Sequence, residues 1–263
     1  MLTRFRDQKR ALERQAAREE RQRLKRAANH AAIEKLYEGS TPVILAGSFT
    51  GLQYANTSYG SALLPKLLGS YEEPIHSWIE EVCNSKYYAA IFDVGCAEGY
   101  YACGLAMRLP ATQVYAYDIN KDATRLAKEI AQLNALNNIY FSDLFDIKDI
   151  YRRQDRYENG RIFLMMDIEG DEIKYLNSKN ISFVEGVDIL VELHDCFYPG
   201  ITQIIVDALS NSHEISIVYD YPWRHFQQYS PTAKIERSEL ESLMDESRPA
   251  GMSWLFARSR SEG

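Results

Sequence analysis

Between residue 87 and the C-terminus, short apolar runs alternate with stretches of helical periodicity, and this alternation limits the fold more than any other feature of the chain. A short apolar run bounded by turn residues is typical of a buried strand, and apolar residues three and four positions apart predict an amphipathic helix. The expected strands cover about residues 89–94, 113–117, 138–141, 161–166, 187–193, 214–219 and 253–257. The expected helices cover about residues 73–84, 101–109, 121–136 and 201–209.

This order of elements predicts an α/β fold. Strands that alternate with helices form right-handed crossovers, and the result is a mostly parallel sheet with helices on both faces. We therefore expect a mostly parallel seven-stranded sheet. Such sheets bind ligands in the crevice outside the carboxyl ends of their strands. Functional residues are accordingly expected where each strand ends.

The N-terminal 40 residues differ from the rest of the chain. They hold 11 Lys/Arg and 6 Asp/Glu, which leaves 19 of the 30 basic and 31 of the 37 acidic residues for the remainder. Residues 1–40 are rich in good helix formers and contain no Gly or Pro before Gly39, so they predict a basic helical arm. Its apolar stripe is thin, which indicates a solvated helix that the rest of the chain does not need for folding. A helix for self-association or for a partner is the alternative, and a nucleic-acid or membrane arm is disfavoured.

Two further segments complete the expected domain organisation. Residues 41–70 are rich in Gly and Ser and predict a connector with little regular structure. Residues 71–263 form the expected α/β domain.

Composition excludes several classes of protein. No run approaches the roughly 18 apolar residues of a membrane span. The charged N-terminus is not followed by the apolar segment of a secretory signal. Four cysteines without a C-x-x-C pair argue against a disulfide scaffold or structural zinc, and favour a reducing, cytoplasmic setting. The acidic body disfavours non-specific nucleic-acid binding, because contacts to phosphates require cations.

The first expected strand ends in a glycine loop, Asp93-Val94-Gly95-Cys96-Ala97-Glu98-Gly99. Glycines four positions apart between a strand and a helix allow a tight turn and close approach of a ligand to the backbone. The loop is neither the G-x-G-x-x-G dinucleotide motif nor a P-loop. Taken alone, it could be a purely structural turn.

The next two strands end in acidic residues. Asp118 follows the second strand and is placed to accept hydrogen bonds from the hydroxyls of a ribose. The alternative is an N-cap for the helix that begins near Lys121. Asp143 follows the third strand, where its carboxylate could accept a hydrogen bond from an adenine amino group, or could be a turn residue. In this order, the three strand ends suit a nucleoside ligand without pyrophosphate, and S-adenosylmethionine (SAM) fits that description.

Four short stretches carry a resemblance to known families. The stretch from Ile91 to Tyr101 resembles the first motif of class I SAM-dependent methyltransferases, and Tyr117-Asp118 resembles their second. The stretch Met166-Asp167-Ile168-Glu169-Gly170-Asp171-Glu172 resembles the signature of the FkbM-type methyltransferases, and Val191-Glu192-Leu193-His194 resembles that family's fifth strand end. The FkbM pattern usually has Asn in the glycine loop and Glu-Pro at the second strand end, whereas this chain has Cys96-Ala97-Glu98 and Asp118-Ile119.

The resemblance implies a Rossmann-like class I methyltransferase fold over about residues 87–195, with SAM as the cofactor. It also implies a role for each matched residue. The methionine part of SAM would lie among residues at the end of the first strand. The ribose would lie at the end of the second strand, and the adenine at the end of the third. The implied cofactor residues are Asp93, Gly95, Cys96, Ala97, Gly99, Asp118, Ile119, Asp143 and Leu144.

The candidate catalytic residues follow the fourth and fifth strands. Methyl transfer depends largely on positioning, and an acceptor hydroxyl also needs a base or a metal to take its proton. His194 is the expected base, since imidazole titrates near neutral pH, with Asp167 and Glu169 beside it. As an alternative, Asp167 with Glu192 or His194 could bind a divalent cation. We do not assign metal ligands from the sequence.

The segment Tyr219 to Phe226 combines aromatic and polar residues after the sixth strand. It is expected to form an acceptor pocket or a lid, or else to be an aromatic loop packed on the core.

The leading functional hypothesis is SAM-dependent O-methylation of a small-molecule or sugar hydroxyl. The alternative is a non-catalytic SAM-binding or scaffold protein whose N-terminal helix recruits a partner. An NAD-linked enzyme is disfavoured, because the glycine spacing of a dinucleotide site is missing. The expected partners are a small-molecule acceptor and, through the arm, a second copy or another protein.

Overall fold

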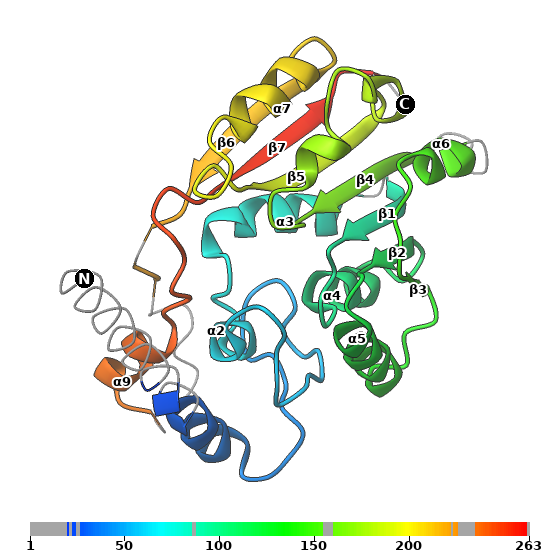
Figure 1. Ribbon diagram of the computed structural model, residues 1–263. Coiled ribbons are helices and arrows are strands. Elements are labelled where there is room, and N and C mark those ends of the chain that lie inside the picture. The colour runs from blue at the N-terminus through cyan, green and yellow to red at the C-terminus, as the bar shows by residue number, and fades with distance from the viewer. Residues whose placement is uncertain are drawn as a thin grey trace, which may run out of the picture.

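A computed structural model of the chain describes residues 20, 23–24, 27–85, 88–154, 160–221, 223–225 and 235–261 (Figure 1). The strands are β1 (Tyr88–Val94), β2 (Gln113–Tyr117), β3 (Ile139–Ser142), β4 (Arg161–Met166), β5 (Val187–Leu193), β6 (His213–Tyr219) and β7 (Ser253–Ser259). The helices are α2 (Leu63–Leu68), α3 (His76–Asn84), α4 (Tyr100–Arg108), α5 (Lys121–Leu133), α6 (Lys148–Gln154), α7 (Ile201–Leu209) and α9 (Arg237–Leu243). Three short 3₁₀ turns are η1 (Glu73–Ile75), η2 (Glu172–Lys174) and η3 (Ile181–Phe183).

The seven strands form one sheet in the order β3-β2-β1-β4-β5-β7-β6. Strands β1 to β5 pair in parallel, while β7 lies antiparallel between β5 and β6. The expected mostly parallel α/β sheet is therefore confirmed. The strand order reverses at β1 and β4, and ligands of such sheets bind at this switch point.

Helices cover both faces of the sheet (Figure 1). Alternate residues along a strand point to opposite faces, so Phe163 packs in the cluster with α3, α4 and α5, whereas its neighbour Leu164 packs in the cluster with α6 and α7. The same alternation separates Trp254 and Leu255 on β7. Because both faces of the sheet are buried, each strand is a continuous apolar run in the sequence. For this reason the predicted strand positions agree well with the observed ones.

Residues 41–70 hold more structure than the expected connector. All six residues of α2 are buried, and an isolated antiparallel bridge joins Val43 to Gln53. Gly69 ends α2 in a left-handed conformation, where an added Cβ would lie 1.9 Å from the carbonyl oxygen of Ala46. Glycine is therefore needed here for a close contact between two chain segments, whereas the composition of the stretch had indicated a loose loop.

The described part of the N-terminal arm is helical over residues 27–37, and it packs on the body (Figure 1). Ala32 is fully buried in a cluster with α2 and α9, whose members include Leu64, Leu68 and Leu240. Lys35 forms an exposed ion pair with Glu239 of α9. This contact contradicts the expected solvated helix over this range, because alanine alone offers enough surface for close helix packing. Residues 1–19, 21–22 and 25–26 of the expected arm lie outside the described residues.

The helix boundaries differ from the expected ones by a few residues. Helix α5 begins at Lys121 as expected but ends at Leu133 rather than near 136, because Ala135 takes a left-handed conformation. Helices α2, α6 and α9 were not expected, since each has only six or seven residues and too few turns to display a period. Within the described residues, no helix has the length and apolar character that crossing a bilayer requires.

Candidate active site

The carboxyl ends of β1, β2, β4 and β5 open into one cavity of about 420 Å³. A pocket of this size suits a ligand as large as a nucleoside derivative. Its lining brings together seven carboxylates and three basic side chains from distant parts of the chain. They are Glu72, Asp93, Asp118, Asp167, Glu169, Glu192 and Glu246, with Lys66, His194 and Arg248.

The glycine loop forms one wall of this cavity. Gly95 has φ +89°, and an added Cβ would lie 1.7 Å from the carbonyl oxygen of Asp167, so only glycine fits between the ends of β1 and β4. Cys96 and Ala97 line the cavity beside it. Gly99, in contrast, does not line the cavity: an added Cβ would meet Ala127 and Cys103 at 3.0 and 3.1 Å. Its role in the structure is to let α4 and α5 approach closely.

Asp118 lines the cavity and also holds the glycine loop. Its carboxylate accepts hydrogen bonds from the backbone N–H of Ala97 (2.8 Å) and of Asn120 (2.7 Å). The N-cap of α5 is Asn120, whose side chain accepts from Asp122 and Ala123, so the cap reading of Asp118 is wrong. Each carboxylate oxygen retains a lone pair that could accept from a ribose hydroxyl.

The expected adenine residues are not brought into the cavity. Asp143 is exposed and is not part of its lining. Ile119 and Leu144 follow the adjacent strands β2 and β3 and are 78% and 75% exposed. Both are therefore large apolar side chains in contact with water at the ends of paired strands.

Asp93 lies buried at the end of β1. Burial raises the pKa of its carboxyl to about 7, and the charges of Asp167 and Asp118 add to the effect. Its Oδ2 atom has no hydrogen-bond partner among the described residues. A buried carboxylate of this kind needs a cationic or donating partner, and a ligand amino group would supply one.

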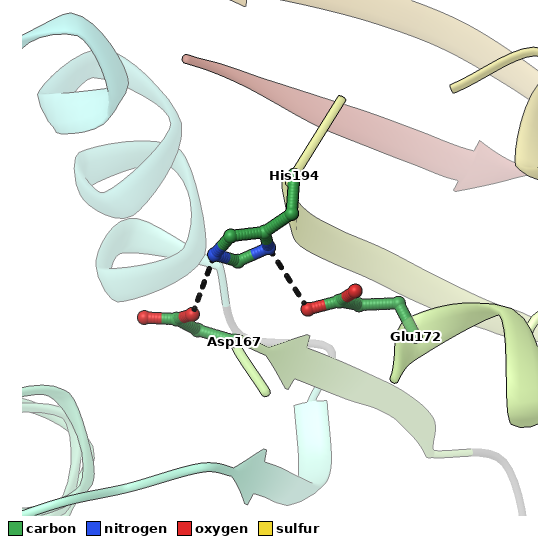
Figure 2. A group of neighbouring side chains, drawn as sticks. All are labelled: Asp167, Glu172 and His194. Carbon is green, nitrogen blue, oxygen red and sulfur yellow. Dashed lines mark ion pairs between the residues drawn. The ribbon is translucent and has the colours of Figure 1, made fainter. Parts of the chain in front are cut away.

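His194 lies at the centre of a carboxylate cluster (Figure 2). Its Nδ1 atom is 3.1 Å from Oε1 of Glu172, and its Nε2 atom is 3.6 Å from Oδ1 of Asp167 and from Oε2 of Glu169. The imidazole is only 2% exposed and Glu172 is fully buried. The same Glu172 oxygen accepts from the backbone N–H of Ile168 and Gly170, so the turn after β4 fixes its position.

This environment raises the pKa of His194. Burial by itself would lower the pKa, but the contact with Glu172 and the charges of Asp167 and Glu169 outweigh burial. Glu169 is the most exposed member of the cluster, at 76%, and has a left-handed φ of +58°. The structure thus brings the three expected catalytic residues together and adds Glu172, which the sequence analysis had not selected as a candidate.

Comparison with known proteins gives a match to the first part of the α/β domain. Residues 86–159 match the family model described as a methyltransferase domain, which spans β1 to α6. This match bears out the expected enzyme class, a SAM-dependent methyltransferase. It also supports SAM as the cofactor. A search of curated proteins gave no match.

Three solved structures indicate the range of proteins with a similar fold. One is an rRNA methylase from Streptococcus thermophilus (10% identity, TM-score 0.47, 72% of this chain and 97% of the other). Another is a putative O-methyltransferase from Klebsiella pneumoniae (10% identity, TM-score 0.46, 70% and 77%). A third is a SAM-dependent O-methyltransferase from Thermotoga maritima (16% identity, TM-score 0.44, 71% and 65%).

The methyltransferase has a second buried network beside Asp167. Arg248 forms ion pairs with Glu192 at the end of β5 and with Glu72, and its Nε lies 2.8 Å from Glu246. Burial raises the pKa of Glu192, and burial with the charge of Glu72 raises that of Asp167 to about 6. The sequence analysis missed Glu72 and Arg248, because 176 positions separate them and no local pattern marks either.

Two sets of three side chains have ligand atoms close enough together to hold a metal ion. The candidate ligand atoms of Asp167, Glu172 and His194 lie within 4.8 Å of one another, as do those of Glu72, Asp167 and Glu192. In the second group, Arg248 already pairs with Glu72 and Glu192. The donor set there suits a guanidinium, and a divalent cation would have to displace it.

A buried ion pair joins the glycine loop of the methyltransferase to α2. Lys66 Nζ lies 2.5 Å from Oε1 of Glu98, and the side chains are 3% and 0% exposed. Tyr54, Ser58 and the backbone N–H of Tyr59 also donate to Glu98. Burial alone would raise the pKa of Glu98, but Lys66 and the hydrogen bonds outweigh burial and lower it. Glu98 was one of the departures from the FkbM pattern, and this pair gives it a structural role.

The described part of the aromatic segment 219–225 lies outside the cavity lining. Tyr221 donates to Glu73 at 2.7 Å, and Arg224 pairs with Glu246 at 2.7 Å. These contacts fit the alternative of a packed loop. Pro222 and Phe226 lie outside the described residues.

Asp195, which follows His194, accepts hydrogen bonds from the backbone N–H groups of Gly200 and Thr202 at the start of α7. It therefore acts as a turn residue.

Proposed function

We propose that this enzyme transfers a methyl group from SAM to a hydroxyl oxygen of a small molecule or sugar, with His194 as the general base. The observation that carries the proposal is the cluster of His194, Glu172 and Asp167 at the cavity. The proposed subgroup remains FkbM-type, on the motif that runs from Asp167 to Glu172.

The cavity residues fit the cofactor by charge. Seven carboxylates line the cavity against Lys66, Arg248 and His194, which favours a ligand with the positive sulfonium and ammonium of SAM. The unpartnered Oδ2 of Asp93 suits the amino group, and Asp118 suits the ribose. Ile119 and Leu144 would cover the faces of the adenine, which accounts for their exposure in the free protein.

The bound cofactor supplies an electrophilic methyl group, and the chain's own residues prepare the acceptor. The Nε2 atom of His194 takes the proton from the acceptor hydroxyl as the new carbon–oxygen bond forms and the carbon–sulfur bond breaks. Glu172, on the Nδ1 side, fixes the orientation of the ring and stabilises the imidazolium that results. Asp167 on the opposite side lies close enough to orient the hydroxyl.

The proposed setting is the cytosol, where thiols stay reduced, because all four cysteines are free and three of them are buried. The proposed acceptor is a small molecule rather than a nucleic acid. The proposed boundaries are an N-terminal arm over residues 1–40, of which helix 27–37 packs on the body, a segment over residues 41–70, and the α/β domain over residues 71–263.

Replacing the base tests the proposal. His194→Ala should lower turnover by roughly 10²–10⁴-fold while the Kd for SAM stays nearly unchanged. His225→Ala is the matched control, because this histidine is exposed and lies outside the cavity lining. Turnover is measured as S-adenosylhomocysteine formed with a panel of hydroxylated acceptors, and SAM binding by calorimetry. An unchanged rate in His194→Ala would dismiss the role of the base.

A further inference from the structure

A second hollow adjoins the cofactor cavity. It has a volume of about 1020 Å³ and is lined by residues of helix 27–37 and of the chain from Gly39 to Leu63. Five lining residues are shared with the cofactor cavity: Gly60, Ser61, Ala62, Glu246 and Ser247. The two spaces therefore adjoin at these residues. Ser247 has a left-handed φ of +56° at this junction, and non-glycine residues in this conformation are concentrated at functional sites.

The walls of this groove carry uncharged hydrogen-bonding groups. Hydroxyl and amide side chains are contributed by Asn29, Ser40, Thr41, Asn56, Thr57 and Ser58. Four of these residues, Ser40, Thr41, Asn56 and Thr57, are exposed, and the described residues offer their side chains no hydrogen-bond partner. The Oδ1 atom of Asn29 is buried and likewise has none in the described part of the chain. Such groups suit a ligand that both donates and accepts hydrogen bonds.

Charge narrows the class of ligand. Among the described residues that line the groove, none is Lys or Arg. The acidic residues there are Glu34 and Glu246, and Glu246 is already paired with Arg224 and Arg248. A phosphorylated molecule or a nucleic acid would find no Lys or Arg among the described lining residues, which offer His30 as their one imidazole, whereas an uncharged polyhydroxylated molecule would find many hydrogen-bond partners there.

We propose that the groove binds the body of the methyl acceptor, that this acceptor is a neutral saccharide, and that helix 27–37 forms one wall of the site. The proposal rests on the proposed function, because the groove can serve as an acceptor site only if SAM binds in the adjacent cavity. The saccharide reaches the cofactor cavity past Gly60 and Ala62 and presents a hydroxyl to His194. The N-terminal helix is then part of the acceptor site.

The test separates saccharide binding from SAM binding. Saturation-transfer NMR measures binding of a panel of neutral trisaccharides built from glucose, galactose, mannose or N-acetylglucosamine, with S-adenosylhomocysteine present. Thr57→Trp fills the groove without touching the cofactor cavity, and Thr57→Ser is its matched control. Asn29→Ala removes the unpartnered acceptor but keeps a good helix former. Calorimetry measures the Kd for SAM of each protein, and circular dichroism checks folding.

At least one trisaccharide should bind the parent protein and Thr57→Ser. Thr57→Trp should weaken that binding at least about tenfold, and Asn29→Ala about three- to tenfold, with the Kd for SAM within about twofold of the parent value. The proposal is overturned if no trisaccharide binds the folded parent, or if Thr57→Trp binds as well as the parent. Tighter binding of a phosphorylated trisaccharide or a short RNA would also overturn it. Failure of the parent to bind SAM would instead refute the proposed function.

Discussion

The carboxylate of Asp118 both stabilises the local backbone and lines the cofactor cavity. It holds the glycine loop through Ala97 and the start of α5 through Asn120, and it lines the cavity at the strand end where a ribose is expected. His194 likewise has a close charged neighbour, because its Nδ1 atom lies 3.1 Å from Oε1 of Glu172. At the scale of the residue, the site is built from carboxylates whose positions are fixed by backbone N–H groups.

Substitution of Asp118 should weaken cofactor binding. A carboxylate that accepts from two hydroxyls makes charge-assisted contacts of about 1.5–3 kcal/mol each, so Asp118→Ala should raise the Kd for SAM at least about tenfold. Calorimetric titration measures the Kd, and circular dichroism confirms that the variant folds. A folded variant with the Kd of the parent would restrict Asp118 to holding the loop.

The pH dependence of turnover should reflect the raised pKa of His194. The general base must be neutral, so turnover should rise with pH along a limb centred above 6.5, where the carboxylates place the pKa. Glu172→Gln removes the nearest negative charge, which destabilises the imidazolium and should move this limb to lower pH. Single-turnover rates from about pH 5.5 to 9 locate the limb in both proteins. If the pH–rate profiles of the parent and of Glu172→Gln have the same midpoint, the group that titrates is not His194.

Two elements that the sequence presented as peripheral prove to be integrated into the domain. Helix α2 is attached to the glycine loop by the Lys66–Glu98 pair, and helix 27–37 packs on α2 and α9 around Ala32. Each contact joins a segment before residue 70 to the cofactor-binding part or to the C-terminal part of the chain. At the scale of the element, the N-terminal segments act as walls of the two hollows.

The buried Lys66–Glu98 pair should be strongly coupled. Lys66→Met leaves the fully buried Glu98 without its cation and should lower the free energy of unfolding by about 3–5 kcal/mol. The double substitution with Glu98→Gln should lose clearly less than the sum of the two single substitutions, because no charge then remains buried. Urea unfolding of the four proteins gives the coupling. Additive losses would mean that the pair does not interact.

The packing of helix 27–37 can be tested with two adjacent alanines. Ala32→Asp places a charge at a fully buried position and should lower the free energy of unfolding by at least about 2 kcal/mol. Ala31→Asp, on the exposed side of the same helix, should cost less than about 1 kcal/mol. Denaturant unfolding compares the two variants. Equal and small losses would return the arm to the solvated helix that its sequence suggested.

The whole molecule separates its charges. The chain has a formal net charge of −7, the cofactor cavity is rich in carboxylates, and the groove beside it has no Lys or Arg among its described lining residues. Such a distribution attracts a cationic cofactor and repels polyanions. It also leaves residues 1–40, with 11 Lys/Arg and 6 Asp/Glu, as a segment with an excess of positive charge.

This charge distribution predicts weak association with RNA. Non-specific binders of nucleic acids have Kd values of about 10⁻⁴–10⁻⁶ M at physiological salt, and this protein should bind a random RNA duplex more weakly than that range. Fluorescence anisotropy over a series of salt concentrations measures the affinity. Micromolar binding that falls steeply with salt would contradict the prediction and would direct attention to the N-terminal arm.

The sequence by itself determined the α/β class, the positions of the seven strands, the glycine loop and the carboxylates and imidazole at the strand ends. These features are encoded locally, because periodicity reports burial and a strand end is visible in a few consecutive residues. Only the tertiary structure decided which distant groups meet: Glu72 with Arg248 and Glu192, Lys66 with Glu98, and Ala32 with α9. It also decided that Gly99 serves helix packing and that Ile119 and Leu144 stay exposed. A single charged or small residue has the same sequence signal on a surface as in a core, and its partner is set by the fold of the whole chain.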